Sequence, residues 1–160
     1  MIEKLLFLLT LLCVLGSGLI AGVFFAFSSF VMKALARRPP DEGMAAMQSI
    51  NVAVLNPWFL GAFLGTAMLC VAVLIASLLR WTMPGSALHL TGSVLYLVGT
   101  FGVTMKFNVP RNEALAVALP TDLEAERLWT NYVADWTFWN HVRTAAAIGA
   151  TVMFGVALGY

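Results

Sequence analysis

The side chains that could bind a ligand or move a proton are almost absent from the middle of the long apolar segments of this sequence. They gather instead where such segments end. Arginine brings five N–H donors in a planar fork, asparagine brings a donor and an acceptor, and histidine titrates near neutral pH. Together such groups could hold the polar part of a ligand. The gathered residues are Asn51, Asn56, Lys106, Asn108, Arg111, Asn112, Glu113, Asp135, Asn140, His141 and Arg143.

Four tryptophans lie near these polar residues, and two explanations fit them. Trp58, Trp129, Trp136 and Trp139 could form the aromatic belt of a membrane interface, with the asparagines as helix caps. A solvated connection, however, needs neither so many asparagines nor so many tryptophans. Taken as a group, these residues favour a binding pocket.

Helical periodicity separates His141 from Arg143 in the last apolar segment. At about 100° per residue, one face carries Trp129, Tyr132, Trp136, Trp139, Asn140 and Arg143. His141 points roughly 140° away from Trp136, so it need not share their pocket. An arginine at the edge of the hydrocarbon is costly. We therefore expect Arg143 to pair with Asp135 or Glu113, or to reach water.

Histidine and cysteine are too few for most metal sites. His89 and His141 belong to opposite membrane ends, which excludes a two-histidine haem within one chain. Cys13 and Cys70 fall in apolar stretches, and the sequence has no phosphate-binding glycine loop and no serine nucleophile elbow. We therefore predict no bound cofactor, and a haem or metal held by His141 stays open as the alternative.

The composition indicates that the chain resides in lipid. Of its 160 residues, 61% are hydrophobic and 11% are charged, whereas about a quarter of the residues are charged in an ordinary soluble domain. The net charge is +1, without a long basic run. This excludes nucleic acid as a partner and leaves the lipid bilayer.

Four segments are long and apolar enough to cross about 30 Å of hydrocarbon as helices. Lipid forces backbone groups to bond internally, so each should be helical. The first far exceeds the roughly 7 to 15 residues of a secretory signal's apolar region and is expected to be retained. We predict a single all-α domain, residues 1–160, folded as an integral membrane four-helix bundle. Its spans are residues 5–32, 57–79, 86–105 and 137–160.

The connections between the spans differ in length. Residues 80–85 form a tight turn with Pro84 and Gly85, whereas the first and third connections are much longer. An even number of crossings places both long connections on one side, opposite the termini. Basic residues are more frequent with the long connections, so the positive-inside rule places these in the cytoplasm. They are Lys33, Arg37, Arg38, Lys106, Arg111 and Arg127, against Lys4 and Arg80 at the other end.

The first long connection has the pattern of a short helix. Met44, Met47 and Ile50 recur at helical spacing. Asn56 followed by Pro57 then predicts an N-cap with proline at the first helical position, at the start of the second span.

The third connection carries similar signals. Asn108 with Pro110 repeats the N-cap device, and Thr121 with Glu124 predicts a capping box. The helix opened there is expected to continue into the last span. The two long connections should therefore form a short helical cap on one side of the bundle.

Glycines recur at the spacing that lets helices approach closely. The pairs are Gly18 with Gly22, Gly61 with Gly65, and Gly155 with Gly159. Such pairs fit contacts within one chain or between chains. A homo-oligomer is therefore a possible assembly.

Motifs along nearly the whole chain resemble the anthrone-oxygenase-like family of small membrane proteins. They are GVFFAFS at residues 22–28, MQSIN at 47–51 leading to Asn56 and Pro57, NVPRN at 108–112, and WTFWNHVRT at 136–144. The resemblance implies a four-helix membrane fold in a bacterial inner membrane. Family members with an assigned role oxidise an anthrone to an anthraquinone with O2 in polyketide pathways.

The resemblance also implies roles for the polar residues. An anthrone has an acidic C–H whose anion is an enolate, which can react with O2 without a metal. Such a site needs a base, donors for the enolate and a flat apolar slot. The catalytic residues are then expected to be His141 as the base with Arg143 and Arg111. The substrate-binding residues would be Asn56, Asn108, Asn112, Trp136, Trp139 and Asn140.

Two readings stay open beside a membrane oxidoreductase acting on a hydrophobic aromatic substrate. His141 could be a helix-packing residue, and the protein could bind a lipophilic small molecule or a partner without catalysis. It could also be a haem or metal protein through His141.

Overall fold

The computed structural model describes residues 2–119 and 123–160, and every regular element in this part of the chain is helical. The all-α prediction is thus confirmed. Segments α1, η1 and α2 form one continuous rod, as do α5, η2, η3 and α6, and the η segments have π-helical hydrogen bonding. The elements are α1 (Ile2–Ala26), η1 (Phe27–Val31), α2 (Met32–Leu35), α3 (Pro40–Ala53), α4 (Pro57–Leu79), α5 (Ser86–Val94), η2 (Leu95–Gly102), η3 (Thr104–Asn108), α6 (Val109–Ala116) and α7 (Leu123–Ala157).

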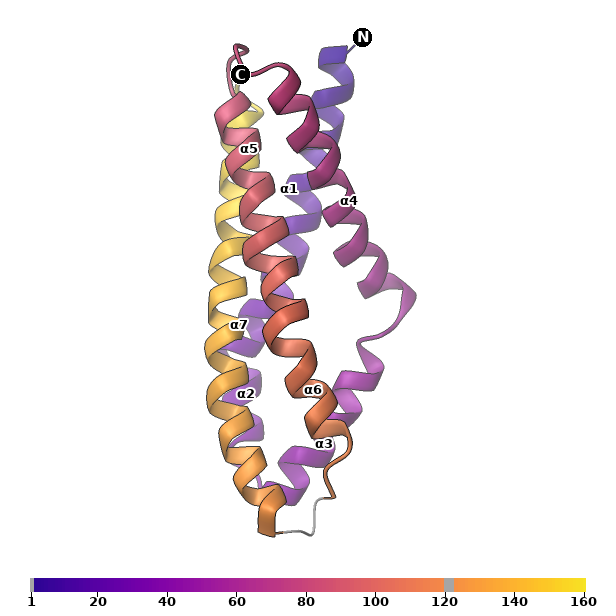
Figure 1. Cartoon of the computed structure of the whole chain (residues 1–160), viewed down its shortest axis with the longest axis vertical. Helices are drawn as coiled ribbons and strands as arrows, with labels where there is room; N and C mark the ends of the chain where they lie inside the picture. The colour runs from indigo at the N-terminus through magenta and orange to yellow at the C-terminus, as the bar shows by residue number, and fades with distance from the viewer. Residues whose placement is uncertain (1, 120–122) are drawn as a thin grey trace.

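The four long rods pack side by side. Helix α1 lies against α4 and α7, and α5 also lies against α4 and α7, which closes a ring (Figure 1). The two termini and the α4–α5 turn lie at one end, whereas α3, α6 and the start of α7 lie at the other. Both long connections are therefore at the same end, as predicted.

Three rods are long and apolar enough to cross a membrane: Glu3–Leu35, Pro57–Leu79 and Ser86–Ala116. They correspond to the first three predicted spans. Helix α7 runs the length of the bundle, but Asn140, His141 and Arg143 lower its apolar character. That α7 is a fourth crossing remains a prediction.

The bundle core is aromatic and aliphatic, and the outer surface is also apolar. Phe24, Phe63, Tyr96 and Phe154 are buried between the rods. Many leucines and valines on the rods are exposed instead, which is what a lipid-facing surface requires because lipid solvates apolar side chains.

Within the chain, most of the predicted glycine pairs make no close helix contact, and their role in contacts between chains remains a prediction. A Cβ added at Gly22, Gly61, Gly65 or Gly155 would meet nothing within 4 Å, and only Gly18 faces another helix, at 3.6 Å from Thr151. Other glycines make the close approaches, because an added Cβ there would overlap a side chain of the next helix. These are Gly16 against Thr66, Gly92 against Phe154 and Gly99 against Ala146.

The predicted helical cap is present. Met44 and Met47 on α3 pack with Leu115 of α6 and Trp129 of α7 in a buried cluster. The Gln48 amide donates to the carbonyls of residues 115 and 118, at 2.8 and 3.1 Å, and so joins α3 to the end of α6.

The predicted N-cap at Asn56 is confirmed. Its Oδ1 accepts from the backbone N–H groups of Trp58 and Phe59 at 3.1 and 3.0 Å, and Pro57 is the first residue of α4. The predicted capping box depends on Thr121, which lies outside the described residues.

The second predicted N-cap, at Asn108, is wrong. Asn108 has right-handed helical dihedrals and makes no capping bond, because the helix runs through this point without a break. Pro110 lacks an N–H, and its ring would clash with the carbonyl four residues earlier. The π-helical turn η3 ends at Asn108, two residues before the proline, and accommodates it by wider hydrogen bonding. Asn108 is thereby free to bond α7.

Candidate functional site

Three π-helical segments supply polar side chains to one stretch of α7. Ser28 comes from η1, Thr100 from η2, and Thr104 and Asn108 come from η3. A π-helical turn changes the direction of the side chains that follow it, and such turns are frequent at functional sites. Here they bring hydroxyl and amide groups to a helix face within the bundle.

Arg143 is the centre of this arrangement. Its side chain is buried, with 6% of the residue exposed. Its Nε donates to Asn140 Oδ1 at 2.9 Å, and its Nη1 donates to Thr104 Oγ1 at 3.2 Å. The guanidinium carbon lies 3.8 Å from the ring centre of Phe24 and 4.9 Å from that of Trp136. We call Phe24, Ser28, Thr104, Trp136, Asn140 and Arg143 the Arg143 cluster.

The guanidinium has no carboxylate partner among the described residues, and neither Asp135 nor Glu113 lies within ion-pair distance of it. The expected pairing is therefore wrong. The cation is stabilised by ring faces and by neutral oxygens, which compensate less than an anion would. Such a centre is suited to receive an anionic oxygen.

Asn140 orients the side chain of Arg143. Its Nδ2 donates to the Phe24 carbonyl at 2.9 Å and to Ser28 Oγ at 2.7 Å, and its Oδ1 accepts from Arg143. These partners leave no freedom to exchange the amide oxygen and nitrogen. Asn140 therefore both joins α1 to α7 and orients the cation.

Asn112 organises the aromatic side of the site. Its Oδ1 accepts from the Tyr132 hydroxyl at 2.9 Å and from Trp136 Nε1 at 2.8 Å. Burial raises the pKa of the Tyr132 phenol, so this group remains a donor. Trp129, Tyr132 and Trp136 stack in sequence, with ring centres 5.8 and 6.0 Å apart.

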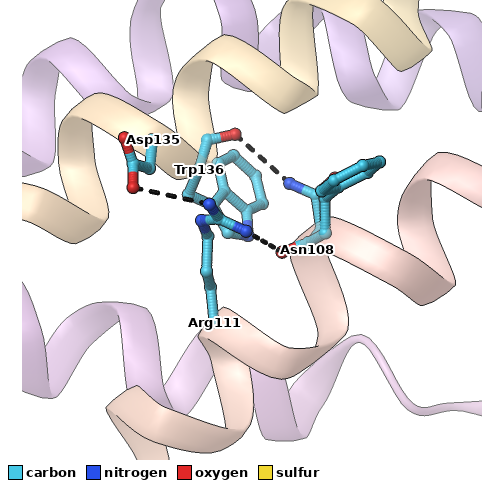
Figure 2. A network of polar contacts seen from close by, with 5 residues as sticks. Asn108, Arg111, Asp135 and Trp136 are labelled. Atoms are coloured by element: carbon cyan, nitrogen blue, oxygen red, sulfur yellow. Dashed lines mark hydrogen bonds and ion pairs between the residues drawn. The ribbon is translucent and has the colours of Figure 1, made fainter.

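Asn108 and Arg111, on the η3–α6 rod, reach two neighbouring residues of α7, Trp136 and Asp135 (Figure 2). Asn108 Nδ2 donates to the Trp136 carbonyl at 3.2 Å, and its buried Oδ1 has no partner among the described residues. Arg111 donates to the Phe107 carbonyl at 2.8 Å and lies 3.4 Å from Asp135, at a partly exposed position. Arg111 therefore takes the carboxylate that had been expected to pair with Arg143.

A family comparison bears on this site. A family model described as Anthrone oxygenase matches residues 56–153, which is more than half of the chain. The chain belongs to the anthrone oxygenase family. This confirms the resemblance seen in the motifs. The family match contains Asn108, Asn112, Asn140 and Arg143, whereas Phe24 and Ser28 on the α1–η1 rod lie outside it. No curated protein and no solved structure matches the chain.

The structure does not bring all the predicted family residues together. His141 is exposed and points away from the bundle, in agreement with its calculated angle on the helix. The side chain of Asn56 is engaged in capping α4. Trp139 is half-buried and stacks on Phe107 with ring centres 3.5 Å apart. Catalytic or binding roles for these three residues remain predictions.

Sequence reasoning missed several members of the cluster. Phe24 is one of many apolar residues in its span, and nothing in its type distinguished it as the ring that covers Arg143. The residue type of Thr104 did not distinguish it either, although its position near Lys106 weakly indicated that it belongs to the polar group. Within the described part of the chain, no group of three or more histidine, cysteine or acidic residues could hold a metal.

Proposed function

We propose that this family member is a membrane-embedded oxidoreductase in which Arg143 holds the enolate oxygen of a lipophilic, anthrone-like substrate during oxidation by O2. The observation that carries the proposal is a buried guanidinium without a carboxylate among the described residues. A positive charge in a site of low dielectric stabilises a developing oxyanion strongly.

The free edge of the guanidinium supports this role. Phe24 and Trp136 lie over the guanidinium, and Nε and Nη1 have protein partners. Nη2 has no hydrogen-bond partner among the described residues, so it is the edge left for a ligand oxygen.

The chemistry then requires no step at a metal. The substrate CH2 loses a proton and becomes an enolate, which gives an electron to O2. The substrate radical and superoxide then combine, which forms a C–O bond and a carbon-bound peroxide anion, and protonation of this anion gives the hydroperoxide. Loss of water removes the remaining hydrogen of that carbon and cleaves the O–O bond. In total, CH2 and O2 become C=O and H2O.

Arg143 promotes the first step by lowering the pKa of the bound C–H acid, since it stabilises the charged form. In this proposal water takes the proton. His141 is not required, because its side chain lies on the exposed side of α7.

We further propose that α7 crosses the membrane as the fourth span of a bacterial inner-membrane protein, with the long connections in the cytoplasm. The basic residues of those connections support this orientation. The Arg143 cluster would then lie near the cytoplasmic side, where a substrate dissolved in the bilayer could reach it.

Oxygen uptake by the purified protein with a hydroxylated anthrone tests the function. Arg143→Gln should lower the enzymatic rate, above spontaneous oxidation, by about a hundredfold or more, as loss of an oxyanion donor does. Arg143→Lys keeps the charge without the fork and should retain part of the rate. Undiminished uptake by folded Arg143→Gln would refute the proposal. Tight anthrone binding without uptake by the wild type would favour a binding protein instead.

A further inference from the structure

A cavity of about 650 Å³ lies at the end of the bundle that carries the termini and the α4–α5 turn (Figure 1). Its volume is within the range of small-molecule sites. No residue of the Arg143 cluster lines it, so nothing in the proposed oxidation uses it. Residues of α1, α4, α5 and α7 all contribute to its wall, and the apolar lining residues include Leu6, Phe7, Ala76, Met83, Ala157 and Leu158.

The buried polar side chains of this cavity are already hydrogen-bonded within the protein. Thr10 and Ser77 each donate to the carbonyl four residues earlier, at 2.8 and 2.7 Å. Ser86 donates to the Arg80 carbonyl at 2.8 Å, and His89 Nε2 lies 3.0 Å from Thr10 Oγ1. An alkyl group can therefore lie against these side chains without leaving a polar atom unpaired.

The charged residues of the lining are Glu3, Lys4 and Arg80, and Arg80 is the least exposed of them. The side chain of Arg80 is 28% exposed, whereas that of Glu3 is 81% exposed. These two side chains approach each other only to 4.0 Å, which is too long for a hydrogen bond. Within residues 2–119 and 123–160, no group accepts a hydrogen bond from the Arg80 guanidinium. Its donors are therefore available to a ligand.

The position of the cavity fits a ligand that is oriented like a membrane lipid. Thr10 lies two helical turns further into the bundle than Glu3, so the cavity is about 10 Å deep along α1. Trp81 and Tyr160 are exposed at the same end of the bundle, and such aromatic side chains are enriched at membrane–water interfaces. A head group at Arg80 would thus lie at the membrane surface, with its chain directed toward the bilayer centre.

We propose that this cavity is a second ligand site for an anionic amphiphile. Its phosphate or carboxylate head is bound by Arg80 and Lys4, and its alkyl chain lies along the apolar wall. The planar guanidinium fork donates two parallel hydrogen bonds to such heads. The ammonium of Lys4 adds a second positive charge to the lining. A free single-chain acid and a membrane phospholipid both carry this chemistry.

A matched pair of probes tests the site. Decyl phosphate and decyl dimethyl phosphate share a chain and a head of similar shape, but the triester has no charge. Calorimetric titration of the purified protein in a neutral detergent should show about tenfold tighter binding of decyl phosphate, as expected for charge-assisted hydrogen bonds. Arg80→Gln should remove most of this preference, and Arg80→Lys should retain part of it. Equal binding of the two probes by the wild type, or an undiminished preference in folded Arg80→Gln, would overturn the proposal.

Further variants locate the two parts of the ligand. Ala76→Trp fills the cavity and should weaken decyl phosphate binding at least tenfold although Arg80 is intact. Glu3→Gln removes a negative charge from the lining and should tighten binding about twofold to threefold, as expected for an exposed charge. Arg38→Gln, at the opposite end of the bundle, is the matched control and should bind as the wild type does. Undiminished binding by Ala76→Trp would place the probe outside the cavity and refute the site.

The two sources of the ligand are distinguished in phosphatidylcholine nanodiscs. Replacing part of this lipid with phosphatidylglycerol should weaken decyl phosphate binding if a phospholipid occupies the site, because the two compete. Binding should be unchanged if only a single-chain acid fits. Either result supports the anionic amphiphile, whereas no saturable binding of decyl phosphate in either membrane would contradict it. Arg143→Gln should bind decyl phosphate as the wild type does, so the result is independent of the proposed oxidation.

Discussion

At the scale of single residues, one buried cation and the amides around it define the site. Periodicity alone placed Arg143, Asn140 and Trp136 on one face and His141 on another, because a regular helix fixes those angles. It could not identify the partners of Arg143. Its partners on other rods, Phe24 and Thr104, depend on the packing of the rods and on π-helical turns that no local pattern revealed.

A variant of His141 tests whether its exposed position or its place in the WTFWNHVRT motif better indicates its role. His141→Ala should keep most of the oxygen uptake, within about threefold of wild type, because the side chain is exposed and outside the Arg143 cluster. Uptake assays on the pure variant measure this. Loss of all uptake in a folded His141→Ala protein would instead make His141 the base.

Asn112 should be important for stability. Asn112→Ala removes the acceptor of two buried donors, on Tyr132 and Trp136, and should cost about 2 to 6 kcal/mol at roughly 1 to 3 per unpaired group. Asn112→Asp keeps an oxygen there and serves as the matched control. Thermal unfolding in detergent should therefore show a clear loss for alanine and a small change for aspartate. Equal midpoints for the alanine variant and wild type would show that these bonds contribute little.

At the scale of elements, sequence patterns located the helices well and their irregularities poorly. The start of α4 was predictable because Asn56 and Pro57 act locally. The same residue types at Asn108 and Pro110 predicted an N-cap that is absent. There η3 and α6 continue one rod, and packing against α7 determines the conformation. Glycine spacing did not locate the close contacts within the bundle for a similar reason, since it does not show which face meets a helix of the same chain.

Gly99 and Gly61 form a test of which glycines matter. A Cβ at Gly99 would come 2.6 Å from the Cβ of Ala146, whereas one at Gly61 would meet nothing within 4 Å. Gly99→Ala should therefore push η2 from α7 and cost about 1 to 3 kcal/mol. Gly61→Ala should be neutral or slightly stabilising, because alanine favours helix. Thermal midpoints of the two variants measure the difference, and equal midpoints would contradict the packing described here.

At the scale of the whole molecule, the bundle has two chemically different ends. The end with the long connections has a buried cation held by neutral side chains, and the end with the termini has a cavity lined by apolar, hydroxyl and charged side chains. Composition predicted a helical membrane protein, since apolar content and segment length determine that class. It could not predict the cavity, because its wall is made by residues far apart in the chain.

The central claim is that Arg143 stabilises an enolate, and an anaerobic titration tests it most directly. Without O2, the enolate of a bound anthrone accumulates and can be followed by its visible absorption as the pH rises. In the wild type, half-ionisation should occur about 1 to 3 pH units lower than for the anthrone in detergent alone, as expected beside a cation. Arg143→Gln should abolish that difference while still binding the anthrone. The same half-ionisation pH in both proteins would contradict the account.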